Sequence, residues 1–271
     1  LANSNVSRHF AETLLSFLVS QLPALSDPAS PHSPVLIKLF KLVFGSVTLF
    51  PENEPVLLPH LVAIVTGAMR RASCSPQAAS YFTLLRALFK SIGGGKFDAL
   101  YRELAPLLPT LLPALLRAHS AARERSTREL LLELCLTLPA RLSSLLPHLQ
   151  LLSQPVLHAL SEGSDQAGLA LRTLEFWIDH LNPAFWAAKL KPVLPKITEA
   201  LMYHLRPAPY PHGHAAMRVL GKLGGRSRTG LGLGGLSGGG GLASGIGGFG
   251  RIASDAASRR TPDIGTNQLA V

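Results

Sequence analysis

The first stretch whose residue types could bind phosphate is the glycine run Gly93-Gly94-Gly95 with Lys96 directly after it. A P-loop needs Gly-x-x-x-x-Gly-Lys followed by Ser or Thr, between a strand and a helix, so that backbone N–H groups hold the phosphates and the hydroxyl binds Mg²⁺. Here Phe97 follows the lysine, and a helical pattern precedes the glycines. The sequence therefore predicts a turn between two helices, with Lys96 exposed to solvent.

Two further motifs also lack the context that their chemistry needs. Gly230, Gly232 and Gly235 match the Gly-x-Gly-x-x-Gly pattern of dinucleotide sites, but no strand precedes them and the surrounding sequence is rich in glycine. His212 and His214 offer two imidazoles without a third ligand nearby, which is a weak metal site. We expect a solvated loop for the histidines, and neither a cofactor nor a metal.

Carboxylates and thiols offer no reaction centre either. Glu175, Asp179 and Glu199 form no acid/base pair that the spacing supports. Cys74 and Cys135 are the only cysteines and lie far apart, so a disulfide framework is not expected and a reducing compartment fits. Both thiols are predicted to be buried and inert. No catalytic residue is predicted, and the residues of any binding site stay undefined.

Aromatic residues cluster in one part of the chain, which allows two interpretations. The cluster consists of Phe176, Trp177, Phe185 and Trp186. An exposed patch of this kind would suit peptide binding, because aromatic side chains anchor interfaces. Packing between neighbouring helices is the alternative, and it is favoured because aromatic side chains tend to be buried.

The elements that would position these residues are predicted to be helices. Apolar residues recur every three or four positions from Phe10 to Leu223, and no alternating strand pattern interrupts them. The first stripe consists of Phe10, Leu14, Phe17, Leu18 and Gln21. A later stripe of Phe82, Leu85, Phe89 and Ile92 is expected to face inward from a helix that the glycine run ends. Predicted helices cover residues 9–25, 35–49, 59–71, 123–138, 145–161, 169–181, 191–205 and 215–223, with further helices on both sides of the glycine run. Ser75 is the expected N-cap of the helix that precedes the glycines, with Pro76 in its first turn.

A proline-containing tetrad, Leu-Pro-x-Leu/Ile, repeats along these helices. Its prolines are Pro23, Pro59, Pro109, Pro147 and Pro195, spaced by 36, 50, 38 and 48 residues. HEAT and armadillo repeats, which are pairs of helices, have periods of about 40 to 47 residues. Because proline is tolerated in a first helical turn, each tetrad is expected to mark a helix start. Of Pro106, Pro109 and Pro113, one is expected to start a helix and another to kink it.

Composition narrows the classes of partner. The formal net charge is +10, which favours acidic partners, although arginines spread over solvated helix faces would give the same value. The most apolar run contains Lys38 and Lys41 and is too short and too charged for a membrane span. From residue 224 to 250 the sequence is of low complexity and rich in glycine, and the part after Arg228 is predicted to be disordered.

Three stretches resemble the helical-repeat region of the transformation/transcription domain-associated protein family and its yeast relatives, which are pseudokinases related to phosphoinositide 3-kinases. They are "YFTLLRALFKSIGGGKFDALYRELAPLLPTLL", "LALRTLEFWIDHLNP" and "RVLGKLGGRSR", and the resemblance covers residues 10–228. Leu223 stands where the family usually has phenylalanine, and the glycine-rich sequence replaces further repeats. The resemblance implies a nuclear scaffold of SAGA-type and NuA4-type histone acetyltransferase complexes that docks activators and has no catalytic activity.

The expected fold class is therefore all-α, a HEAT/armadillo-like solenoid over residues 1–228 of about five helical pairs, followed by a disordered tail over residues 229–271. The expected partners are protein subunits of histone acetyltransferase complexes and acidic transcription activators. Neither a small-molecule substrate nor a membrane is expected. Two alternatives stay open: a generic HEAT-repeat adaptor or transport protein, and the solenoid of an active kinase of the same superfamily. Direct nucleic-acid binding is a weaker idea, for which a steep salt dependence would be the sign.

Overall fold

The computed structural model describes residues 3–26, 32–75, 77–94, 96–161, 166–182, 188–206 and 211–226. Helices and short connections account for these ranges, and no strand occurs among them, so the all-α prediction is confirmed. The predicted tail over residues 229–271 lies outside the described residues.

The described elements are twelve α-helices and four 3₁₀ helices. The α-helices are α1 Ser4–Ser20, α2 Ser33–Leu49, α3 Glu54–Cys74, α4 Ala78–Ile92, α5 Asp98–Leu104, α6 Leu108–Ala121, α7 Arg125–Leu136, α8 Leu142–Leu145, α9 Leu149–Ser161, α10 Ala167–His180, α12 Leu194–Tyr203 and α13 Gly213–Arg226. The 3₁₀ helices are η1 Leu22–Ser26, η2 Pro51–Asn53, η3 Ala105–Leu107 and η4 Leu146–His148.

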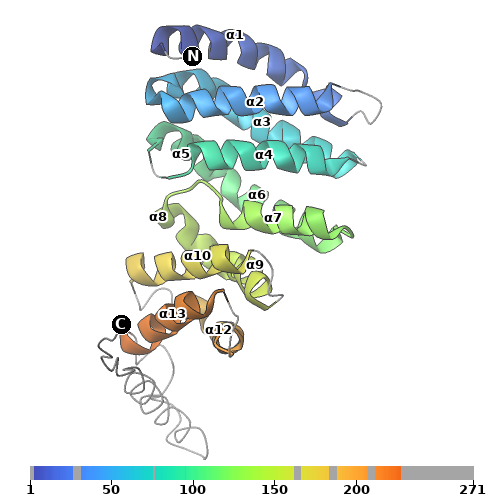
Figure 1. The fold of residues 1–271 in the computed structure, drawn as a ribbon. Helices are drawn as coiled ribbons and strands as arrows, with labels where there is room; N and C mark the ends of the chain where they lie inside the picture. The colour runs from blue at the N-terminus through green and yellow to red at the C-terminus, as the bar shows by residue number, and fades with distance from the viewer. Residues whose placement is uncertain are drawn as a thin grey trace, which may run out of the picture. The chain divides into compact units, whose positions relative to one another are not determined.

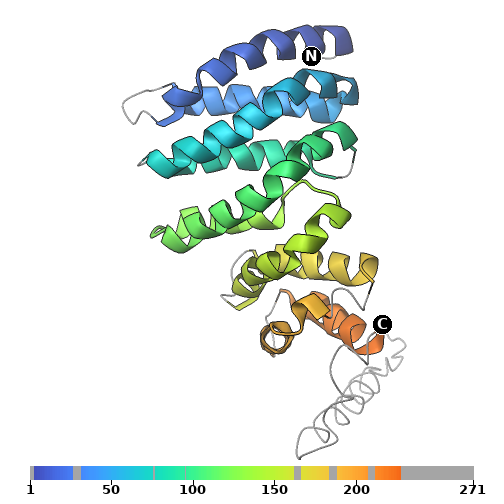
Figure 2. The ribbon, with the colours of Figure 1, turned by 180° about the vertical axis from the view of Figure 1, so that it is seen from behind.

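The helices of residues 3–226 form two rows (Figure 1). One row contains α2, α4, α7, α10 and α13, in which each helix contacts the next. The other row, nearer the viewer in Figure 2, contains α3, α6, α9 and α12. Contacts between α6 and α7 and between α9 and α10 join the rows, and α1 packs on α2 and α3. This is the architecture of a helical-repeat stack, in which each pair buries its apolar faces against its neighbours.

Two apolar clusters form the core, and they meet at α6 and α7. The first extends from α1 to α7 and the second from α6 to α13. Adjacent leucines separate them: Leu111 and Leu131 belong to the first cluster, whereas Leu112 and Leu132 belong to the second. Successive residues of a helix point about 100° apart, so both helices contribute to two layers at once.

The structure corrects several predicted helix starts. Helix α4 begins at Ala78 after Gln77 and not directly after the expected N-cap Ser75, whose Oγ accepts the Gln77 N–H at 3.0 Å. The first helix begins at Ser4 instead of residue 9, because the side-chain oxygen of Asn3 accepts the backbone N–H of Asn5 at 2.9 Å and caps an earlier turn. The third begins at Glu54 instead of Pro59, with Pro55 in its first turn. Pro59 then lies inside α3, where it lacks the N–H for one backbone hydrogen bond.

The core face of α1 was also predicted wrongly in part. Of the predicted stripe, Leu18 is buried but Phe10 and Phe17 are exposed, and Ala11 and Leu15 are buried instead. Apolar residues follow helical spacing on both sides of α1, so the pattern alone cannot distinguish the two sides. The packing partners α2 and α3 decide which one is buried.

Each of the five proline tetrads lies in the second element of a helical pair. Four of them begin η1, α6, η4 and α12, as predicted, and the exception is the tetrad of Pro59 inside α3. Among the prolines near residue 109, Pro109 lies in the first turn of α6, which confirms the expected helix start. Pro106 lies in η3, and Pro113 lies inside α6. Each of the four described 3₁₀ helices contains a proline, namely Pro23, Pro51, Pro106 or Pro147.

Candidate interaction surfaces

The glycine run forms the predicted turn between α4 and α5. Gly93 ends α4, and its N–H donates to the Phe89 carbonyl at 2.9 Å. A Cβ on Gly93 would lie 2.9 Å from that same carbonyl oxygen, and Gly94 has a φ of +99°, which L side chains rarely adopt. Lys96 is exposed, as expected. Gly95 lies outside the described residues.

The residues considered for metal and dinucleotide binding do not form a site in the described part of the chain. No group of three or more His, Cys, Asp or Glu side chains is placed there to hold a metal. His212 packs edge-on against His204, with ring centroids 6.0 Å apart. His214 is exposed in the first turn of α13, which begins at Gly213, so the loop predicted for both histidines ends at His212. Gly230, Gly232 and Gly235 lie outside the described residues.

The cysteines differ from each other in environment. Cys135 is buried, as predicted, and burial raises the pKa of its thiol to about 12. Cys74 is exposed at the end of α3, so the prediction that both thiols are buried was wrong for this one. Packing against neighbouring helices stops at a helix end, and the sequence around Cys74 does not indicate that α3 ends there.

The aromatic cluster separates into a core residue and a surface residue. Trp177 is buried in the second apolar cluster, whereas Phe176 is 47% exposed. The Phe176 ring lies 4.4 Å from the ring of His180, and the Phe176 carbonyl oxygen lies 2.9 Å from His180 Nδ1. Phe185 and Trp186 lie outside the described residues. Core packing is thus confirmed for Trp177 only.

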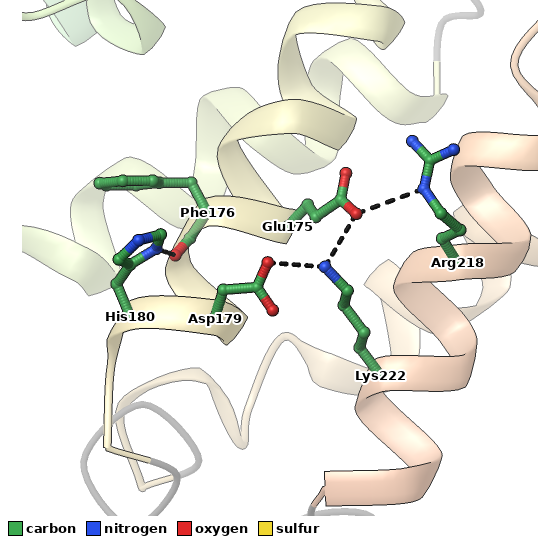
Figure 3. A network of polar contacts seen from close by, with 6 residues as sticks. All are labelled: Glu175, Phe176, Asp179, His180, Arg218 and Lys222. Atoms are coloured by element: carbon green, nitrogen blue, oxygen red, sulfur yellow. Dashed lines mark hydrogen bonds and ion pairs between the residues drawn. The ribbon is translucent and has the colours of Figure 1, made fainter. Parts of the chain in front are cut away.

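A network of charged side chains joins α10 to α13 (Figure 3). Lys222 Nζ donates to Glu175 Oε1 at 2.9 Å and to Asp179 Oδ2 at 2.6 Å. Arg218 Nε donates to the same Glu175 oxygen at 3.3 Å. Two acids four residues apart on α10 therefore face two bases four residues apart on α13. This spacing was visible in the sequence, but the pairing of the two helices was not.

The network shifts the pKa values of its members. The hydrogen bond from Lys222, then that from Arg218, holds the pKa of Glu175 below its ordinary value of 4.5. The hydrogen bonds to Asp179 and Glu175 raise the pKa of Lys222 above 10.5. Glu175 and Asp179, whose carboxylates could have served acid/base chemistry, are thus structural: they attach α13 to α10 through the ion pairs with Lys222. Glu199 is exposed on α12 and is not part of the network.

A second, more buried acid joins α4 to α7. Glu133 is 9% exposed, and its carboxylate accepts from Lys90 Nζ at 2.6 Å and from Arg86 Nη1 at 3.4 Å. Arg86 and Lys90 are four residues apart on α4, so they reach one acceptor from the same face. Both charge networks therefore connect neighbouring helices of the row that contains α4, α7, α10 and α13.

A half-open groove lies beside Phe176. Its volume is about 240 Å³, and its lining comes from the end of α7, the connection after it, α8, α9 and α10. The lining residues are Cys135, Leu136, Leu138, Ala140, Leu145, Leu152, Arg172, Thr173, Phe176 and Trp177. Eight of them are apolar and none is acidic. The groove is therefore an apolar recess with a guanidinium at its edge.

No helix in the described ranges has both the length and the apolar composition to span a membrane.

The chain has relatives of known name. A family model for the Tra1 HEAT repeat central region matches residues 1–208. The chain is 45% identical over 229 residues to the human transformation/transcription domain-associated protein, and 43% identical over 231 residues to the SAGA complex/NuA4 acetyltransferase complex subunit TRA1 of Saccharomyces cerevisiae. The Drosophila melanogaster transcription-associated protein 1 is also 45% identical over 229 residues.

These matches cover 84% of the chain but only 6% of each relative. The network between α10 and α13 joins two of the three stretches on which the resemblance in the sequence rests. The described helices form the repeat stack that the family model names. The chain belongs to the transformation/transcription domain-associated protein (Tra1) family, and it corresponds to the central HEAT-repeat region of that family.

Proposed function

We propose that this chain is a non-catalytic scaffold segment of a transcription complex of the SAGA/NuA4 acetyltransferase type, acting in the nucleus. The observation that carries the proposal is the family match over residues 1–208. One relative, the subunit from Saccharomyces cerevisiae, is named as a member of both complexes. The fold supports the role, because stacked helical pairs present extended surfaces to partner proteins.

The proposal includes docking of acidic activator segments. With 26 Lys and Arg against 16 Asp and Glu, the chain attracts acidic partners and speeds their encounter. Helix α2 illustrates the surface available. It has no Asp or Glu, its Lys38 and Lys41 are exposed, and Val35 and Leu42 are exposed beside them. Such a face combines positive charge with apolar contact area.

The test is purification of the epitope-tagged chain from nuclei of the cells that produce it. We expect known acetyltransferase subunits to co-purify, together with acetyltransferase activity on histones. Co-purification with cytosolic cargo and without those subunits would contradict the scaffold role and favour a generic adaptor. Kinase activity in a preparation of the chain would contradict the non-catalytic assignment.

Activator docking needs a separate measurement on the purified chain. We expect an acidic activation peptide to bind more weakly as salt rises, because screening weakens exposed charge pairs. A variant with Lys38→Glu and Lys41→Glu should bind less than the wild type if α2 contributes. Tighter binding of double-stranded DNA than of the acidic peptide at the same salt concentration would overturn docking in favour of nucleic-acid binding.

A further inference from the structure

We propose that the groove beside Phe176 receives one bulky apolar side chain of an acidic peptide segment, and that Arg172 pairs with a carboxylate next to that side chain. This inference rests on the proposed activator docking and assigns it a site. The occupant is thus a partner segment that combines an apolar anchor with neighbouring Asp or Glu residues.

The size and lining of the groove favour a side chain over a metabolite. Sites for drug-sized ligands usually have volumes of roughly 300 to 1,000 Å³ and several convergent polar groups. This groove measures about 240 Å³, and Arg172 and Thr173 are the polar side chains in its lining. Leu138, Leu145 and Trp177 instead offer an apolar wall. An aromatic or aliphatic anchor residue suits that recess.

The edge of the groove adds an aromatic contact. Phe176 is 47% exposed although it neighbours the buried Trp177. Its ring already packs against His180 and is thereby held at the rim. An exposed aromatic beside an apolar recess is the composition of an interface centre, because aromatics are enriched among residues that dominate binding energy.

Charge selects an acidic occupant. The acids of α10, Glu175 and Asp179, face α13 and are paired with Lys222, so they do not line the groove. Arg172 is exposed at the edge, and no carboxylate of the described residues pairs with it. Arg141, the last residue of the connection that lines the groove, pairs with Asp98. Arg172 is therefore the guanidinium that the groove offers to a ligand.

The experiment measures binding of a labelled synthetic peptide, in which one Phe is flanked by Asp residues, to the full chain. Arg172→Gln should weaken the affinity about two- to fivefold, as expected for an exposed ion pair. Phe176→Ala should weaken it about tenfold. Ala140→Trp, which fills the groove, should weaken it at least as much. Replacing the peptide's Phe by Ala, or its Asp by Asn, should reproduce these losses.

Matched variants control for general effects of charge and apolar area. Arg102→Gln removes an exposed arginine from α5, and Met217→Ala removes an exposed apolar side chain from α13. Both should leave the affinity unchanged within twofold. Thermal melting of each variant should match the wild type, since Arg172 and Phe176 lie at the surface. If a groove variant melts early, the altered peptides, tested on the wild-type chain, still decide the question.

The outcomes separate the site from the function. If the peptide binds with the expected salt dependence but Arg172→Gln, Phe176→Ala and Ala140→Trp have no effect, the groove assignment is wrong and activator docking stands. If the peptide fails to bind the wild-type chain, both the groove assignment and the proposed activator docking are wrong. If an Asn-flanked peptide binds equally well, the groove does not select acidic segments. Self-association of the chain that Phe176→Ala abolishes would identify a second copy as the occupant and overturn the proposal.

Discussion

The helices before α7 and the helices after α9 are attached to their neighbours by different chemistry. In the first region, buried neutral groups bond across the stack: Tyr81 donates its hydroxyl to the Leu22 carbonyl at 3.1 Å, and the Asn53 amide donates to Ser7 Oγ at 3.1 Å. In the second region, α13 is attached to α10 by the ion pairs of Lys222 and Arg218. The first kind of contact is insensitive to salt, whereas the second is screened by it.

The comparison is not absolute, because each region also contains contacts of the other kind. In the first region, the Glu54 carboxylate on α3 accepts the N–H groups of Ala99 and Leu100 on α5. Asp98 of the same helix α5 pairs with Arg141. Glu133 brings an ion pair into the first cluster through α4 and α7. His204 brings a buried neutral contact into the second, with Nε2 lying 2.9 Å from the Leu160 carbonyl oxygen. The difference is therefore sharpest at the two ends, where α1 and α3 meet in one region and α10 and α13 meet in the other. A stack whose ends differ in this way should loosen first at α13 when charge pairing is weakened.

The largest expected effect comes from placing a charge in the first core. Leu85 is fully buried on α4, and Leu85→Asp leaves an unpaired carboxylate among apolar side chains. We expect a loss of about 4 kcal/mol or more in the free energy of unfolding of this region. Circular dichroism during thermal melting measures it. Ala79→Asp, on the exposed start of the same helix, is the control and should melt close to the wild type.

A smaller effect is expected from removing one buried neutral hydrogen bond. Tyr81→Phe keeps the packed ring and deletes the hydroxyl that donates to Leu22. The cost should be about 1 kcal/mol in urea unfolding, the usual net value of one such bond. The difference between variant and wild type should be the same in low and high salt. A difference that shrinks with salt would show that the first region also depends on charge.

The smallest expected effect concerns the ion pairs of α13 and depends on pH. The lowered pKa of Glu175 means that its contribution is present above pH 4.5 and is lost as pH falls through the lower folded-state value. The raised pKa of Lys222 means that its contribution is present below pH 10.5 and is lost as pH rises through the higher folded-state value. Proteolysis near α13 should therefore be slowest between these limits. Lys222→Gln should raise the rate of proteolysis near α13, but by less than Leu85→Asp raises the rate of cleavage in the first region. Lys222→Gln should also flatten the alkaline part of the plot of proteolysis rate against pH. An unchanged pH dependence of proteolysis in Lys222→Gln would show that these ion pairs do not attach α13 to α10.

Helical spacing predicted the class of fold and much of the core. Leu85 and Phe89 were expected to face inward, and both are fully buried. Spacing failed where a helix has apolar residues on two sides, as with Phe10 and Phe17 on α1, because the choice of face depends on neighbours far away in the sequence. The tetrads marked the starts of α6 and α12, and of η4 directly before α9, but not the start of α3, which begins earlier with Pro55 in its first turn.

The candidate site was less accessible from sequence. Trp177 and Phe176 are adjacent and of similar character, yet one is in the core and the other is at the rim of the groove. Their helix places them about 100° apart, and only the position of α9 and the connection after α7 determines which one is covered. The acids Glu175 and Asp179 could be placed on one helical face, but their partners lie more than 40 residues away on α13.

Amide hydrogen exchange of the full chain in low and in high salt compares the attachment of both regions in one sample. Raising salt from about 0.1 M to about 1 M shortens the screening length from about 10 Å to about 3 Å. We expect faster amide exchange at high salt in α13 and in the part of α10 that faces it. The exchange rates of α2 and α4 should stay the same relative to each other. Equal acceleration in both regions, or acceleration in α2 and α4 alone, would contradict this expectation.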